Sequence, residues 1–236
     1  MKQYTAVFHL ILRAALFPSL LICAVMVLAE SVMFLALSPS SYDLVWMFDS
    51  KLPFLIFSVS VTVLTIVLLR TGSKHSADPG LTLRRLSISE QHVFLLQAGC
   101  NLLFYLLLAL VQALLLLCFS LVKLSGDSRQ TLFLILHGSF FAHTFFPFRD
   151  ILLWISNGIM LLTMSMAAAH VPYAQRRGKH LHELFLVISV FILNLHPRTY
   201  AMLQSILTIV VCLLFLSYTL YCVFREEDVY NEAECF

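Results

Sequence analysis

Long runs of apolar residues, separated by short polar connections, constrain this chain more than any other feature of its sequence. Residues 14–37, 52–69, 98–122, 151–169 and 200–224 are each apolar over nearly their whole length. A helix needs about 20 such residues to cross the hydrocarbon core of a bilayer. The chain of 236 residues is 60% hydrophobic and only 12% charged. These features predict an all-α, polytopic membrane protein with a single transmembrane domain.

Two further apolar stretches are less regular. Residues 181–195 form a short run, which reaches spanning length if Lys179 and His196 at its ends extend their polar groups to the membrane surface. Residues 131–148 contain a glycine, two histidines and, near their end, Pro147. They can form either a span or an external helix at the membrane surface, with their phenylalanines at headgroup depth.

The distribution of basic residues favours six spans over seven. If residues 131–148 do not cross and the N-terminus is cytoplasmic, most of the 15 Lys and Arg residues fall on the cytoplasmic side, as the positive-inside rule requires. A span at 131–148 would move the basic loop at 174–180 and Arg225 to the other side. We therefore expect six spans, both termini in the cytoplasm, and an external interfacial segment in the connection 123–150.

Residues 70–97, RTGSKHSADPGLTLRRLSISEQHVFLLQ, are the one long polar interruption. An Asp-Pro-Gly turn at 78–80 divides them. Ser87 and Glu90 have the spacing of a capping box, which predicts a helix that starts at Ile88 and continues into the third span. Such a loop can be a topology signal that binds anionic lipid. It can also be a stiff docking element that transmits a push from a soluble partner.

The overall plan resembles the membrane subunits of ABC exporters of the second type, which are six-span permeases that pair with a separate ATPase. The shared features are an amphipathic N-terminal stretch at 1–13, six spans with both ends inside, and the sequence RRLSISEQHVF at 84–94. This sequence has the form basic–Leu–x–Ser–x–x–x–hydrophobic, which in that family belongs to the coupling helix on the ATPase. The resemblance implies that the ATPase-coupling residues are Arg84, Arg85, Leu86, Ser87, Glu90 and Phe94.

The resemblance also implies which partners the chain has. They are a separate ATP-binding subunit and a second permease chain, in a homodimer or heterodimer, within membrane lipid; no nucleic-acid partner is expected. The chain has no phosphate-binding G-x-x-x-x-G-K-[ST] loop, so it is not expected to be an enzyme by itself. The six cysteines show no paired spacing and no eukaryotic sorting signal is present, so we expect a bacterial cytoplasmic (inner) membrane location.

One connection departs from the family. Its lipid- and polysaccharide-exporting members usually carry a re-entrant hairpin between spans five and six, whereas residues 196–198 here are only HPR. An alternative is therefore a non-transporting scaffold, immunity or sensing subunit that holds a partner protein. No cofactor or metal site is expected: His180 and His182 in KHLHELF lie two apart and do not share a helix face.

Polar residues inside the spans are the remaining candidates. An ionisable group in hydrocarbon is costly, and Glu30 lies in the outer half of the first span, about 10 Å from its end. It can reach the surface, form a helix–helix hydrogen bond or line a translocation path. Gln112 and Asn157 can join helices or line the same path. The acidic residues after Arg225 are expected to form a solvated cytoplasmic tail.

Overall fold

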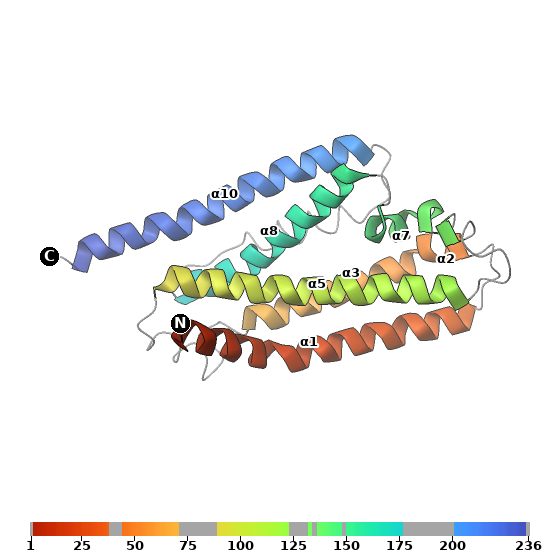
Figure 1. Ribbon diagram of the computed structural model, residues 1–236, viewed down its shortest axis with the longest axis horizontal. Helices are drawn as coiled ribbons and strands as arrows, with labels where there is room; N and C mark the ends of the chain where they lie inside the picture. Colours follow the sequence, from red (N-terminus) through yellow and green to blue (C-terminus); the bar gives the residue numbers. More distant parts are fainter. Residues whose placement is uncertain are drawn as a thin grey trace.

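The structure is a computed structural model that describes residues 2–37, 44–70, 89–122, 132–133, 136–147, 150–176 and 201–234. Within these ranges the secondary structure is helical and contains no strand. The helices are α1 (Lys2–Leu37), α2 (Leu44–Asp49), α3 (Lys51–Arg70), α5 (Glu90–Val122), α7 (Phe140–Phe145), α8 (Ile151–Arg176) and α10 (Ala201–Glu234). The long helices lie along a common direction, and the two ends of the chain lie at the same end of the bundle (Figure 1).

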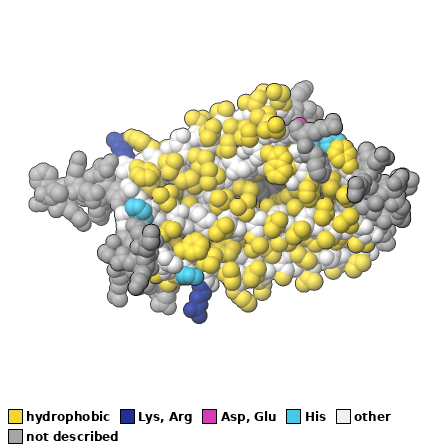
Figure 2. Space-filling model, viewed as in Figure 1, with side chains coloured by type: hydrophobic (Ala, Val, Ile, Leu, Met, Phe, Trp, Pro, Cys, Tyr) yellow, Lys and Arg dark blue, Asp and Glu magenta, His cyan; other side chains and the backbone are white. Residues whose placement is uncertain are grey.

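Five of the described helices are long and apolar enough to cross a membrane. Their apolar segments are Thr5–Leu37, Leu52–Arg70, Glu90–Val122, Ile151–Gln175 and Met202–Arg225. Hydrophobic side chains cover most of the face in Figure 2, and the Lys and Arg side chains visible there lie at the end that carries the termini. The chain therefore has the character of a multi-pass membrane protein. The sixth predicted span, 181–195, lies outside the described residues.

The helices extend beyond the predicted spans. Helix α1 is continuous from Lys2, so residues 2–13 belong to the same helix as the first span; Val7 and Ile11 are buried against Val93 and Cys100 of α5. This packing draws the N-terminal stretch into the bundle, because each of the four side chains gains a buried apolar neighbour. Helix α5 spans 33 residues, or about 50 Å, which exceeds the hydrocarbon thickness of about 30 Å.

The start of α5 differs from the predicted start, and the end of α10 lies beyond the predicted span. Helix α5 begins at Glu90 rather than Ile88; Ser89 before it is not helical, and its hydroxyl contacts the ring of His92. Helix α10 continues through the acidic residues after Arg225 to Glu234, and the solvation of this tail stays a prediction. An apolar pattern is not needed there, because the preceding turns already nucleate the helix.

Helices α8 and α10 pack side by side and run in the same direction. Met166 and Tyr173 of α8 share one buried cluster with Leu216 and Val223 of α10, and the Tyr173 hydroxyl donates to the carbonyl oxygen of Val223 at 3.4 Å. The end of α8 and the start of α10 consequently lie at opposite ends of the bundle (Figure 1). A span at 181–195, as predicted from the sequence, requires that these two helix ends lie at opposite ends of the bundle.

Small side chains allow α8 to lie between α5 and α10. Ala167, Ala168 and Ala169 are all buried, and α8 has extensive contacts with both neighbouring helices. Without a hydrophobic driving force between helices in lipid, close approach of backbones is a main source of packing energy. The small-residue run that the sequence shows in its fourth span therefore forms this packing surface.

Residues 131–148 do not form one long helix in the part that is described. Ser139 interrupts the helical residues, and α7 has only six residues. The rings of Phe141 and Phe145 contact the ring of Phe57 of α3 at centroid distances of 6.2 and 5.2 Å. These two phenylalanines thus pack into the bundle, because edge-to-face aromatic contacts are available there, and they do not lie free at headgroup depth.

Candidate functional site

Helix α5 carries a row of buried polar side chains. Gln97, Asn101, Tyr105 and Gln112 are each at most 2% exposed. Their spacings of four, four and seven residues place them on one face of the helix. A buried polar group is costly in hydrocarbon unless it is hydrogen-bonded, so the partners of these groups show which helices α5 is joined to.

The first joint is a pair of two predicted path residues. The side-chain amide of Gln112 donates to Oε2 of Glu30 on α1 at 3.0 Å, and both side chains are buried, Glu30 at 1% exposure. Glu30 therefore forms a helix–helix hydrogen bond and does not reach the surface. Oε1 of Glu30 and Oε1 of Gln112 find no partner in the described part of the chain.

Two further joints link α5 to α8 and α3. The amide of Asn101 donates to the backbone carbonyl of Ser165 at 3.3 Å. The hydroxyls of Tyr105 and Thr65 lie 2.8 Å apart, and Thr65 also donates to the carbonyl of Val61. A hydroxyl has a single hydrogen, so Tyr105 is the donor and Thr65 the acceptor. Helix α5 is thus hydrogen-bonded to three different helices.

Helix α7 is held in place at its first turn. Oδ1 of Asp49 accepts from the Ser139 hydroxyl at 2.8 Å and from the backbone N–H of Phe141 at 3.3 Å. The Ser139 oxygen in turn accepts from the N–H of Ala142, which makes Ser139 the N-cap. The carboxylate of the last residue of α2 thus complements the start of α7.

The other end of α7 is tied to α8. The side-chain amide of Asn157 donates to the carbonyl oxygen of Thr144 at 2.9 Å, and Nε2 of His143 lies 2.9 Å from Oδ2 of Asp150. Asn157 was predicted as a path residue; it is bonded to α7 and is separate from the Glu30–Gln112 pair. The three predicted path residues therefore belong to two different places.

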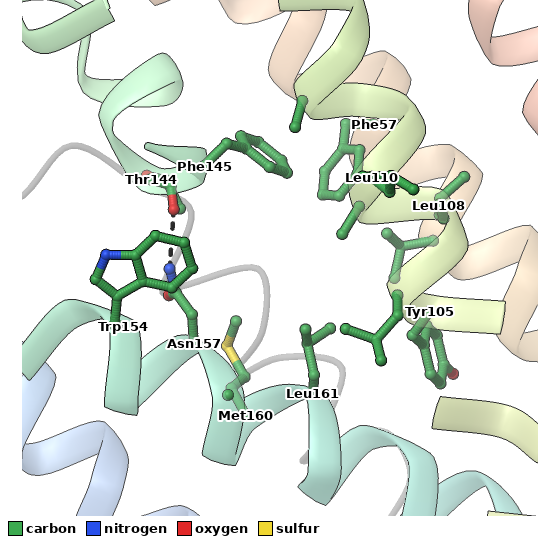
Figure 3. Close-up of a pocket in the computed structure, with 15 residues that line it drawn as sticks. Phe57, Tyr105, Leu108, Leu110, Thr144, Phe145, Trp154, Asn157, Met160 and Leu161 are labelled. Carbon is green, nitrogen blue, oxygen red and sulfur yellow. Dashed lines mark hydrogen bonds between the residues drawn. The ribbon is translucent and has the colours of Figure 1, made fainter. Parts of the chain in front are cut away.

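A cavity of about 450 Å³ lies under α7, between α3, α5 and α8. Figure 3 shows Phe57, Leu108 and Leu110 on one side, Phe145 and Thr144 above, and Trp154, Asn157 and Met160 on the other side. Its lining is overwhelmingly apolar. Small-molecule sites usually have such apolar walls and a volume of about 300 to 1,000 Å³. The cavity is therefore a candidate binding site.

Of the predicted ATPase-coupling residues, Arg84, Arg85, Leu86 and Ser87 lie outside the described residues. Glu90 is the first residue of α5. Phe94 is fully buried, and its ring contacts those of His170 and Tyr173 on α8 at 6.4 and 5.8 Å. It fixes the first turns of α5 to α8 and offers no surface to a soluble protein.

Asp49, Ser139 and Trp154 were missed as site residues. Asp49 and Ser139 are 90 positions apart in the sequence, so no local pattern connects them. Two signals were available. Ser139 is a residue type that is preferred at the N-cap of a helix, and Trp154 lies close to the start of an apolar span, where tryptophan is typical of the membrane interface.

No group of three or more His, Cys, Asp or Glu side chains suited to a metal occurs in the residues that the structure describes. The rings of His137 and His143 contact each other edge to face at a centroid distance of 5.0 Å, and His143 also contacts Asp150.

Comparison of the chain with protein-family models, with curated proteins and with solved structures gave no match to any of them.

Proposed function

We propose that this chain is the permease subunit of an ATP-driven exporter, located in a bacterial cytoplasmic membrane with both termini inside. In this proposal a separate ATP-binding subunit docks on residues 70–97, and two permease chains form the translocation unit. The observation that supports it best is the placement of α5. This helix starts at the end of the basic loop and runs without a break from Glu90 to Val122.

The first turns of α5 pack against α1 and α8, and α8 joins them to α10. Phe94 packs on Tyr173 of α8, and the Tyr173 hydroxyl donates to Val223 of α10. A displacement applied to the loop therefore acts on α5, α8 and α10 together, because packed side chains do not deform continuously. A docking element needs such a rigid connection to move helices.

The far half of α5 carries the joint to α1. Gln112 lies 22 residues after Glu90 in the same helix, about 33 Å along its axis, and bonds to Glu30. Tilting α5 at its start would change the separation of this buried pair. Glu30 and Gln112 are then the residues whose pairing differs between the two states of an alternating-access cycle.

The test is a comparison of two arginine pairs. Arg84→Glu with Arg85→Glu reverses the charge of the proposed dock. Arg176→Glu with Arg177→Glu makes the same change in the other basic loop predicted on that side. Each tagged variant is purified in detergent from its native host, and co-purifying proteins are identified by mass spectrometry and assayed for ATP hydrolysis.

The proposal expects a stoichiometric soluble ATPase with the wild type and with the 176/177 variant, and its loss with the 84/85 variant. Loss with both variants would make the basic charge a topology signal. Absence of any ATPase from the wild type would contradict the exporter function. It would favour the alternative, a scaffold, immunity or sensing subunit, which the short connection at 196–198 supports.

A further inference from the structure

We propose that the cavity under α7 binds one acyl chain of a membrane phospholipid. This inference does not depend on coupling to an ATPase, because it concerns only the walls of the cavity and the medium that reaches them. It rests on three observations: the depth at which the cavity opens, the hydrogen-bonding state of its polar groups, and the fixed position of its roof.

The cavity opens among side chains that face lipid. Leu106, Leu110 and Trp154 line it and are 46%, 57% and 58% exposed. They belong to the membrane-spanning segments of α5 and α8. Apolar side chains that are exposed on a membrane-spanning helix face lipid, so the molecule best placed to enter from the side is an acyl chain.

One residue of the cavity wall is a glycine. Gly158 lines the cavity, and a Cβ atom at this position would meet no other atom within 4 Å. Any larger side chain there would project into the free space. Gly158 is thus the place at which the volume of the cavity can be reduced with the least disturbance of its walls.

Two polar side chains that border the cavity already have partners. The Asn157 amide donates to the Thr144 carbonyl, and the Tyr105 hydroxyl is bonded to Thr65. No Lys, Arg, Asp or Glu lines the cavity in the described residues. A polar ligand would leave its own donors and acceptors unsatisfied there, whereas a hydrocarbon chain requires only van der Waals contact.

The roof of the cavity is fixed before any ligand enters. Helix α7 is bonded to Asp49 at one end and to Asn157 at the other, and Phe145 on its underside packs against Phe57. A preformed apolar space loses little conformational entropy when it is filled. The cavity therefore suits a resident lipid chain better than a ligand that must first displace α7.

The test uses photolabelling in nanodiscs of phosphatidylcholine that contain a small fraction of phosphatidylcholine with a diazirine in its acyl chain. Labelled residues are mapped by peptide mass spectrometry. Leu28 of α1 and Leu207 of α10 are 65% and 59% exposed and do not line the cavity, so they report ordinary contact with bulk lipid. We expect severalfold more label on Met160 and Leu161 than on these two leucines.

A matched pair of substitutions separates the cavity from general lipid contact. Gly158→Phe should fill the space and reduce labelling of Met160 and Leu161 to the level of Leu28. Gly99→Phe changes the other helical glycine that has no atom within 4 Å of a built Cβ, and it should leave the labelling unchanged. If Gly158→Phe does not fold, Ala109→Phe from the α5 wall serves the same purpose.

Three results would overturn the inference. The first is labelling of the cavity residues no stronger than that of Leu28 and Leu207 in the wild type. The second is strong labelling that persists unchanged when a folded variant carries a phenylalanine in the cavity. A cross-link from the cavity to a second protein chain in place of lipid would also overturn it, since the space would then be a protein interface.

Discussion

The Glu30–Gln112 pair gives the sharpest test of how the bundle is held together. Replacing Gln112 by Met removes the one hydrogen-bond partner that the described residues provide to the Glu30 carboxyl group, which is 1% exposed. A hydrogen bond between helices in a membrane contributes about 0.6 kcal/mol on average and up to about 1.7. Leaving the buried acceptor unpaired adds about 1 to 3 kcal/mol. We therefore expect Gln112→Met to destabilise the protein by roughly 2 to 5 kcal/mol.

The double replacement should be milder than this single one. Glu30→Met with Gln112→Met removes both polar groups and keeps the side-chain lengths, so no buried group is left unpaired, and the cost should fall below about 1.5 kcal/mol. Glu30→Gln keeps an acceptor for the Gln112 amide and should cost less than about 1 kcal/mol. The assay is equilibrium unfolding in mixed SDS and dodecyl maltoside micelles, in which 1.4 kcal/mol corresponds to about a tenfold change in the equilibrium constant.

The cycle formed by the two single variants and the double variant isolates the pair. An interaction energy of at least about 1 kcal/mol is expected, because the pair is fully buried. An interaction energy below about 0.3 kcal/mol, within the range of independent sites, would refute the reasoning. The two side chains would then not be bonded in the membrane, and the joint between α1 and α5 would rest on apolar packing alone.

Two other predictions follow from the hydrogen bonds around α3 and α7. Thr65→Val should lower the free energy of unfolding by about 1 to 3 kcal/mol, since it leaves the Tyr105 hydroxyl without an acceptor. Tyr105→Phe should lower it by less than about 1 kcal/mol, because Thr65 keeps its bond to Val61. The same unfolding assay measures both, and equal losses would contradict the assignment of Tyr105 as the donor. Ser139→Ala should lower the stability of α7 by about 1 kcal/mol, which is measured as faster hydrogen exchange of the α7 amides. Ser217→Ala is the control, because Ser217 bonds only to its own helix in the described contacts. Unchanged exchange in α7 would mean that Asp49 alone holds its first turn.

The sequence was sufficient to predict the helices that are long and apolar. The predicted span 52–69 ends one residue before the last residue of α3, and the predicted span 98–122 ends at the last residue of α5. This works because a lipid-exposed backbone must satisfy its hydrogen bonds within the helix, and because the length of a span is imposed by the bilayer. The same physics explains why α2 was missed: a helix of six residues carries neither signal.

The pairing of helices could not be predicted. Both the α1–α5 and the α8–α10 neighbours are parallel, and the contact of Glu30 with Gln112 joins residues 82 positions apart. In lipid the outer and inner faces of a helix are both apolar, so periodicity does not show which face is buried. Asn157 was found as a polar residue in a span, but its partner on α7 depends on a short helix whose position comes from distant contacts.

Parallel packing of α8 and α10 dictates the order in which the chain can be completed. An antiparallel helix can fold back on its predecessor as soon as a short loop has been synthesised. Helix α10 cannot, since it starts at the opposite end of the bundle from the end of α8 (Figure 1). The contact between Tyr173 and Val223 therefore closes late in synthesis. Until then the side of α8 that Leu216 and Val223 cover in the finished bundle has no partner from α10.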